Sequence, residues 1–280
     1  MKLYRIIAFL IITISLLMSS CAHIEENYLY ENINPVWSPK KLEPILVQPI
    51  RFPVKKAIFS ERNQSLYILD ENNTELTIYR NQKLVNRIGR NSSGTGTIQR
   101  ISDIALAKDG NLWLLDNFQK KLYKIDFNGM ILSHFTLTEP LNPTQFIIDE
   151  YNSLIIYDKG RNELMVYESL SLKYIYSFAR MMFVEPLSLS AVKDRIWIYD
   201  KGQNKTFAFL TTGKLIFEMS GQWFYDTHLN LFQYEHSALQ NKSNHFISPL
   251  NYLNRDTIST EGHFITHSGE NQINVYEIKY

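Results

Sequence analysis

Four aspartates and one histidine each follow a short apolar stretch, and their regular spacing makes them the first candidates for chemistry in this 280-residue chain. They are Asp70, Asp116, Asp158, Asp200 and His267. Carboxylates that converged on one point could bind a metal ion or act as general acid and base. Each also begins a polar turn, where Asp side chains commonly accept hydrogen bonds from backbone N–H groups. We therefore expect these residues to stabilise turns and not to catalyse.

Other patterns typical of metal or nucleotide sites are weak. His263 and His267 are four residues apart, but four residues of a strand span about 13 Å, which is too far for one metal ion to bind both. Residues 89–96 have the glycine spacing of a phosphate loop and lack its lysine. The sequence therefore predicts no catalytic residue, no metal site and no cofactor.

An aromatic and methionine cluster is the better candidate for recognition. Trp223, Phe224 and Tyr225 are consecutive, and Met181 and Met182 lie in a separate connecting segment. Aromatic and methionine side chains are enriched at the cores of interfaces, although they also fill packed interiors. Packing between blades is the commoner fate of such side chains, and a partner surface at these five residues is the alternative.

The regularly spaced residues belong to a sequence repeat. Each repeat has an apolar strand, the key polar residue, a turn of four or five residues and a second apolar strand, and the key positions are 46, 42, 42 and 67 residues apart. The last interval predicts a divergent unit at about 222–255, in which Glu235 takes the place of the Asp. The clear units are residues 65–79, 111–125, 153–167, 195–209 and 263–277.

A third strand precedes each pair and a fourth follows it, with Asp-Gly, Asn-Gly and Thr-Gly sequences where the chain must reverse. Four strands in about 42 residues are typical of a β-propeller blade. We predict an all-β chain in which residues 44–280 form a propeller of six four-stranded antiparallel blades. The last unit has three strands, and residues 43–52 would supply its fourth and close the ring from the N-terminal side.

Residues 87–132 resemble the NHL-type repeats of bacterial β-propellers. The likeness lies in a glycine-rich first loop, an Ile-Ala-Leu strand, an Asp-Gly-Asn turn, an Asp at the end of the next strand and a final Asp-x-x-Gly turn. It extends over residues 57–218 and part of 256–280. The resemblance implies the fold and leaves the function open, because propellers include both enzymes and binding modules.

The N-terminal segment has the layout of a secretory signal. Lys2 and Arg5 precede an apolar run at residues 6–18, and this run is shorter than the roughly 20 residues that a membrane-spanning helix needs. An uncleaved anchor is the alternative. We predict a signal peptide at residues 1–20 and a tether at residues 21–43.

The sequence Leu-Met-Ser-Ser-Cys resembles the bacterial lipobox, with Met18 where that motif prefers leucine. The resemblance implies that Cys21, the only cysteine, is acylated after cleavage. Ala22 in the next position implies sorting to the outer membrane. Acyl chains then anchor the protein to the bilayer.

These observations predict an exported, lipid-anchored propeller at the bacterial cell envelope. We expect it to be a non-enzymatic binding or scaffold module for a protein, peptide or glycan, and the alternative is a lactonase-like hydrolase or lyase with a metal site on the propeller axis. Six-bladed lactonases bind calcium through Glu, Asn and Asp side chains, and this pattern is not matched residue by residue here. The formal net charge of +1 predicts no nucleic-acid partner.

Replacing Cys21 by alanine is expected to release the protein from membranes, because the acyl chains would be attached to this sulfur. Immunoblots of membrane and soluble fractions compare the wild type with Cys21→Ala. Ser20→Ala, which keeps the cysteine, is the matched control. Full membrane retention of Cys21→Ala would contradict the lipoprotein hypothesis.

Overall fold

The computed structural model describes residues 41–89, 98–168, 171–226, 230–235, 238–241, 247–249, 257–261, 264–268 and 271–279. These ranges lie in one compact unit, Ser38–Tyr280. All of their regular elements are β-strands, and they contain no helix long and apolar enough to cross a membrane. The predicted signal peptide, Cys21 and the tether up to residue 40 lie outside the described residues.

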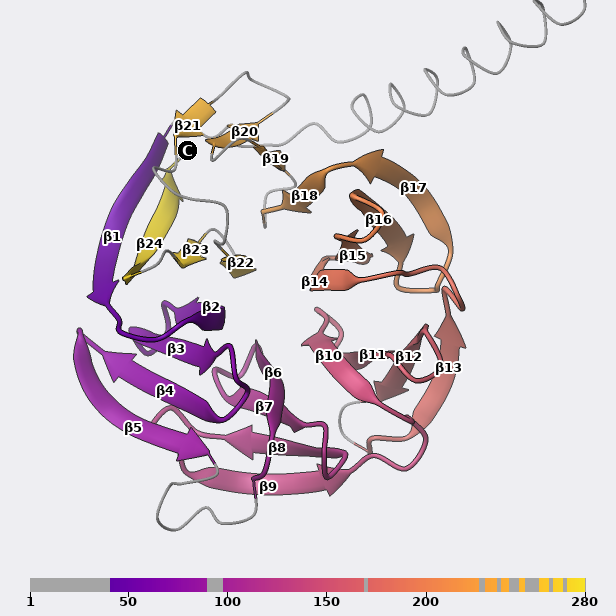
Figure 1. Ribbon diagram of the computed structural model, residues 1–280. Coiled ribbons are helices and arrows are strands. Elements are labelled where there is room, and N and C mark those ends of the chain that lie inside the picture. Colours follow the sequence, from indigo (N-terminus) through magenta and orange to yellow (C-terminus); the bar gives the residue numbers. More distant parts are fainter. Residues whose placement is uncertain are drawn as a thin grey trace, which may run out of the picture. The chain divides into compact units, whose positions relative to one another are not determined.

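The strands form four-stranded sheets in which every neighbouring pair that we describe is antiparallel (Figure 1). Five sheets each consist of four consecutive strands, and one further sheet has the order β1-β24-β23-β22. The predicted count of six blades thus corresponds to five blades of consecutive strands and this composite sheet. The strands are β1 (Lys41–Pro49), β2 (Val54–Ser60), β3 (Ser65–Asp70), β4 (Glu75–Arg80), β5 (Lys83–Gly89), β6 (Ile101–Leu106), β7 (Leu112–Asp116), β8 (Lys121–Ile125), β9 (Ile131–Thr136), β10 (Pro143–Ile148), β11 (Ser153–Asp158), β12 (Glu163–Glu168), β13 (Tyr174–Phe178), β14 (Pro186–Val192), β15 (Arg195–Asp200), β16 (Lys205–Leu210), β17 (Leu215–Ser220), β18 (Gln222–Tyr225), β19 (Leu231–Glu235), β20 (Ala238–Asn241), β21 (Ile247–Pro249), β22 (Thr257–Glu261), β23 (Phe264–Ser268) and β24 (Gln272–Lys279).

The sheets are arranged radially around a central axis (Figure 1). The first strand is innermost in the sheets of consecutive strands, whereas β22 is innermost and β1 outermost in the composite sheet. Strand β6 contacts β2 and β10, β10 contacts β14, and β2 contacts β22. This arrangement is a β-propeller, and the predicted all-β fold class is confirmed. The ring is closed by β1, which pairs with β24 from Lys41 opposite Lys279 to Pro49 opposite Gln272. The segment predicted to complete the last unit therefore does so.

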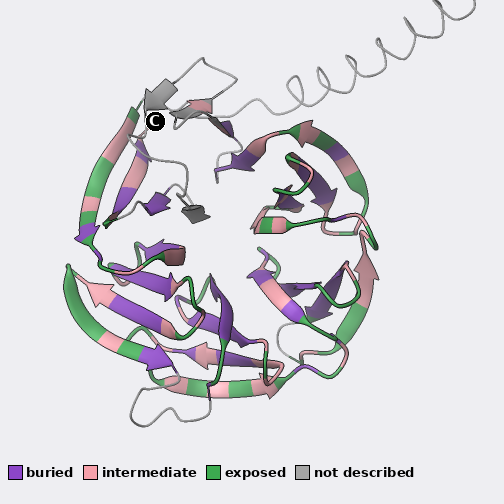
Figure 2. Cartoon of the chain, viewed as in Figure 1, coloured by how far each residue is buried: buried purple, intermediate pink, exposed green. Residues whose placement is uncertain are grey.

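Burial follows the position of a strand in its sheet (Figure 2). All five residues of β7 are buried, whereas the outermost strand β9 alternates between half-buried and exposed residues. Middle strands are buried on both faces because each sheet packs against a neighbour on either side, and outer strands have one face in solvent. Apolar side chains from adjacent sheets share common cores, as Ile58 and Tyr67 do with Ile104 and Leu114. Burying each such side chain contributes about 1.5–3 kcal/mol.

The regularly spaced aspartates hold each blade to the connector that precedes it. Asp116, Asp158 and Asp200 are fully buried at the ends of β7, β11 and β15. The carboxylate of Asp158 accepts the backbone N–H groups of Leu141 at 2.9 Å and Asn142 at 2.6 Å, and both residues lie just before β10. Asp116 accepts the corresponding N–H group of residue 99, and Asp200 those of residues 184 and 185. The carboxylates also accept N–H groups of the turns that follow them, so the prediction that these residues stabilise turns is confirmed for the four aspartates.

Protonation of a carboxylate weakens the hydrogen bonds that it accepts, so these contacts make the stability of the fold depend on pH. Burial alone would raise the pKa of Asp200, but hydrogen bonds from the N–H groups of Val184 and Glu185 and from Gln203 together hold the pKa below its ordinary value. The stability that the ionised Asp200 contributes is fully present above the pKa that this carboxyl has in the unfolded state. It is lost as the pH falls through the lower pKa that the carboxyl has in the folded state. Asp70 differs, since all the hydrogen bonds described for its carboxylate come from the turn that follows it, at Thr74 and Glu75, and none comes from the preceding connector.

The composite sheet corrects one assignment. Asp158 faces Glu163 across a four-residue turn, and Ser268 faces Ile273 across a turn of the same length. Ser268 therefore holds the place of the Asp, and His267, predicted for it, lies one residue earlier in β23. The sequence predicted His267 for this place because Asn271 follows it by four residues, as an Asn follows Asp158 and Asp200 by four residues in the other units.

The predicted divergent unit is the sheet β18–β21. Its strands have four, five, four and three residues, so it is smaller than the other sheets. Glu235 is the last residue of β19, the second strand of this blade, as predicted from its position. Its side chain lies outside the described ones.

Replacing Asp158 by alanine is expected to lower the free energy of unfolding by about 2–4 kcal/mol, because buried backbone N–H groups of two segments lose their acceptor. Asp194→Ala is the matched control, since the side chain of Asp194 is 57% exposed and only approaches Arg195 at 3.8 Å. Its expected effect is below about 0.5 kcal/mol. Urea unfolding followed by circular dichroism measures both, and equal midpoints would contradict this role of Asp158.

Candidate ligand-binding site

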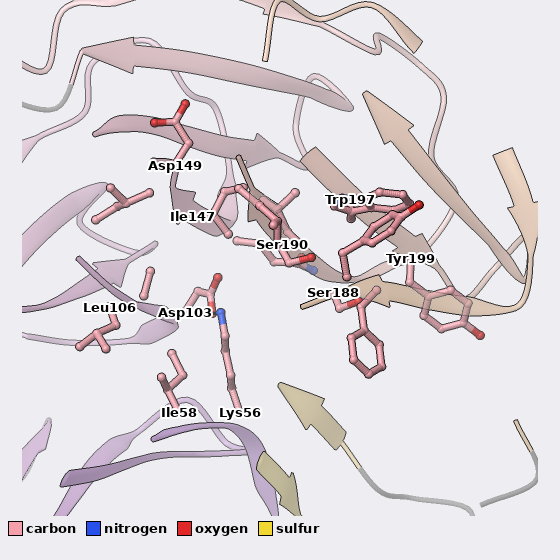
Figure 3. A pocket seen from close by; sticks show the side chains of 18 of the residues that line it. Lys56, Ile58, Asp103, Leu106, Ile147, Asp149, Ser188, Ser190, Trp197 and Tyr199 are labelled. Atoms are coloured by element: carbon pink, nitrogen blue, oxygen red, sulfur yellow. Dashed lines mark hydrogen bonds and ion pairs between the residues drawn. The ribbon is translucent and has the colours of Figure 1, made fainter. Parts of the chain in front are cut away.

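A cavity of about 490 Å³ lies at the centre of the described blades (Figure 3). Its walls come from the inner strands β2, β6, β10, β14 and β18, and from β15, which pairs with β14. Cavities of roughly 300–1,000 Å³ with apolar walls and a few polar groups are typical small-molecule sites. The wall has this composition, and its polar and aromatic parts are described in turn.

An ion pair on one side of the cavity joins three inner strands. The ammonium group of Lys56 on β2 lies 2.9 Å from the Oδ1 atom of Asp103 on β6. Asp103 also accepts the backbone N–H group of Ile104 through Oδ1 and that of Phe146 on β10 through Oδ2, both at 2.9 Å. These donors satisfy both oxygens of a carboxylate that would be costly to bury without partners. Its hydrogen bonds cross from one blade to the next.

The adjacent Lys55 also lines the cavity, but its partners are neutral. Its ammonium group donates to Oδ1 of Asn73 at 2.8 Å and to the backbone carbonyl of Ser102 at 2.6 Å. Burial lowers the pKa of Lys55 below its ordinary value, and the charge of Asp103 opposes this effect only in part. No carboxylate of the described residues forms an ion pair with Lys55.

Gln145 extends the polar links to a fourth inner strand. Its amide nitrogen donates to the carbonyl of Pro186, on β14, at 2.7 Å. Gln145 also lines the cavity, together with Ser188 and Ser190 of β14. Because side chains alternate along a strand, these two serines share one face of β14, and Leu189 and Ala191 on the opposite face pack against the apolar core shared with the β10–β13 blade.

Aromatic side chains form the wall across the cavity from the Lys56–Asp103 pair (Figure 3). The rings of Trp197 and Tyr225 are 4.3 Å apart between centroids and inclined by 57°, and Trp197 also lies against Phe217 at 5.2 Å. Trp197 is only 2% exposed, and no described residue accepts a hydrogen bond from its indole N–H group. Such an unpaired buried donor costs about 1–3 kcal/mol.

The small blade explains why the cavity extends to this side. Strand β18 has four residues, whereas β2, β6, β10 and β14 have six or seven. It contacts β15 and β16 of the preceding blade. The backbone N–H group of Trp223 is bound by the hydroxyl of Thr206 at 3.0 Å, which places β18 against that blade. The side chains of β14 on the side of the small blade therefore line the cavity.

The structure separates the two parts of the predicted partner surface. Trp223, Phe224 and Tyr225 are buried and line the cavity. Met181 is 74% exposed in the connector between β13 and β14, and the half-buried Met182 packs on the core beneath that connector. Neither methionine lines the cavity. The three aromatic residues therefore pack inside the blade, as expected from internal packing, and they also border a cavity that could hold a ligand.

Sequence reasoning missed Lys55, Asp103 and Trp197. The signal for Lys55 and Asp103 was present as charged residues inside short inner strands, in Val-Lys-Lys-Ala-Ile-Phe and Ile-Ser-Asp-Ile-Ala-Leu, whereas Trp197 had no such signal. Among the described residues, no group of three or more His, Cys, Asp or Glu side chains could hold a metal ion. His263 lies outside the described residues, and His267 is buried in its sheet.

No family model matches the chain, and none of the curated proteins matches it. The resemblance to NHL repeats therefore stays a prediction. The chain is similar in structure to virginiamycin B lyase from Staphylococcus aureus, with a TM-score of 0.57 and 14% identity over 85% of this chain and 99% of that chain. A streptogramin B lyase has a TM-score of 0.56 and 12% identity over 85% and 98%.

Hydrazine synthase of Kuenenia stuttgartiensis is also similar, with a TM-score of 0.54 and 11% identity over 82% of this chain and 78% of that chain. At these identities, the likeness of all three structures shows the fold alone. It agrees with the radial sheets in identifying a β-propeller.

Replacing Asp103 by alanine is expected to lower the free energy of unfolding by about 2–4 kcal/mol, because the half-buried Lys56 and the buried N–H groups of Ile104 and Phe146 lose this acceptor. Asp109→Ala is the matched control. Asp109 forms a 2.7 Å pair with Lys124, but both side chains are considerably exposed, so its loss costs about 1 kcal/mol or less. Thermal unfolding measures both variants, and equal shifts would contradict the role of Asp103.

Proposed function

We propose that this protein is a non-enzymatic binding module that holds a ligand in the cavity on its propeller axis. The observation that carries the proposal is the cavity itself, of about 490 Å³, with an ion pair and hydroxyl groups on some walls and aromatic rings on another. Apolar walls supply affinity through burial, and a few fixed polar groups orient a ligand. The blades make a rigid frame for such a site.

The size of the cavity restricts the partner. It accommodates a small molecule, or a short part of a peptide or glycan, and not a folded protein. The lipobox-like sequence at Cys21 supports a place for this module at the bacterial cell envelope, anchored in a membrane and sorted to the outer one. Binding of a ligand that reaches the cell surface or periplasm is the function that combines both features.

The polar groups of the cavity support binding over catalysis. Both carboxylate oxygens of Asp103 accept backbone hydrogen bonds, and one of them also pairs with Lys56. Three of the roughly four acceptor positions of this carboxylate are thus used to join inner strands, which is a structural role. The alternative is a metal-dependent hydrolase or lyase on the axis, and the likeness of fold to two lyases favours it.

Filling the cavity is expected to abolish binding. The probe is N-phenyl-1-naphthylamine, an uncharged aromatic dye that fluoresces in apolar sites, and Ser190→Trp is expected to lower its affinity at least tenfold because Ser190 lines the cavity. Thr136→Trp, on the exposed outer strand β9, is the matched control and should bind as the wild type does. Equal binding by all three proteins, or none by the wild type, would contradict the proposal.

The enzymatic alternative is tested on the same protein. Recovered dye and any ligand co-purified with the wild type are examined by mass spectrometry after incubation with and without a divalent metal. We expect unchanged ligand in both cases. Metal-dependent conversion of a co-purified ligand would favour the hydrolase or lyase.

A further inference from the structure

Three lysines and three acidic residues line the cavity: Lys55, Lys56 and Lys108, and Asp103, Asp149 and Glu150. Lys55 differs from its neighbour Lys56 on β2 in its partners, since Asp103 pairs directly with Lys56 at 2.9 Å. The direct hydrogen-bond acceptors of Lys55 are neutral, at Asn73 and Ser102. A largely buried ammonium group with neutral acceptors is favoured by an anion placed beside it.

The hydrogen bonds of Lys55 leave room for a further partner. An ammonium group has three N–H donors, and those of Lys55 have two acceptors, Asn73 and Ser102. These bonds hold the group at the cavity wall in a fixed position. A preorganised cation with one remaining donor is suited to bind an anion, because little side-chain freedom is lost on binding.

The rest of the wall fits an apolar body. Ile58 and Ile147 line the cavity near the lysines, and Trp197 with Tyr225 lines it on the other side. Figure 3 shows Lys56 and Asp103 across the cavity from Trp197.

We propose that the ligand of this cavity is a small amphipathic anion, with a carboxylate or phosphate group bound by Lys55 and an aromatic or branched apolar body against Trp197 and Tyr225. The inference rests on the proposed binding function and adds the chemical class of the ligand. The burial that lowers the pKa of Lys55 also strengthens its attraction for an anion, since screening by water is weak there.

The test uses a matched pair of probes. The dye 1-anilinonaphthalene-8-sulfonate is N-phenyl-1-naphthylamine with an added anionic group. Wild-type protein is expected to bind the anionic dye more tightly than the neutral one. Lys55→Met, which keeps most of the side chain and removes the charge, should weaken binding of the anionic dye by about tenfold to a hundredfold, as for a lost hydrogen bond to a charged group, and leave the neutral dye unchanged.

Two further variants control for folding and for charge. Lys55→Arg should retain most of the affinity for the anionic dye. Lys205→Met removes an equivalent charge from an exposed pair with Glu218 on the outer part of a blade and should have no effect. Displacement of the dye by 1-naphthylacetate and by 1-naphthyl phosphate then distinguishes a carboxylate from a phosphate group.

Each result has a distinct meaning. If the neutral dye binds in the cavity and Lys55→Met does not weaken the anionic one, the inference about the anion is wrong and the binding function stands. If Ser190→Trp affects neither dye, both proposals are wrong. A selective loss of the anionic dye in Lys55→Met, restored in Lys55→Arg, supports the inference.

Discussion

The structure depends on one constraint, that a sheet with two apolar faces must be covered on both of them. Middle strands such as β7 are buried throughout, so every blade requires a neighbour on either side. A ring meets this requirement without leaving an end blade uncovered, provided that it closes. Closure is achieved by pairing β1 with β24, because a composite sheet joins the two ends of the domain by backbone hydrogen bonds and leaves no open edge between them.

Buried carboxylates supplement apolar packing, and they do so in two places. Asp158 and its counterparts hold each connector against the blade that it enters. Asp103 acts at the axis, where it joins β2, β6 and β10. In both places a charge is buried only because several N–H groups are directed at it. Hydrogen bonds from backbone N–H groups to a buried carboxylate therefore position the connectors of the blades and form part of the polar wall of the central cavity.

The cavity borders the small blade of the ring. Strand β18 of that blade has four residues, and its Tyr225 packs against Trp197 at a centroid distance of 4.3 Å. Proteins that satisfy local rules throughout most of their structure commonly depart from them at functional sites. The departures near this cavity are the short strand β18 and the largely buried Lys55, whose direct hydrogen-bond acceptors are neutral.

The sequence by itself determined the class of fold, the place of each turn and the role of the aspartates, because strands and turns depend on neighbouring residues and leave a local pattern. Only the tertiary structure decided which side chains meet at the axis. Lys55, Asp103 and Trp197 come from three different blades, and a contact between distant repeats leaves no periodic signal. For the same reason, only the tertiary structure shows that Met181 does not line the cavity with Trp223. It also shows that Ser268, and not His267, takes the place of the Asp, since strand register is set by pairing across the sheet.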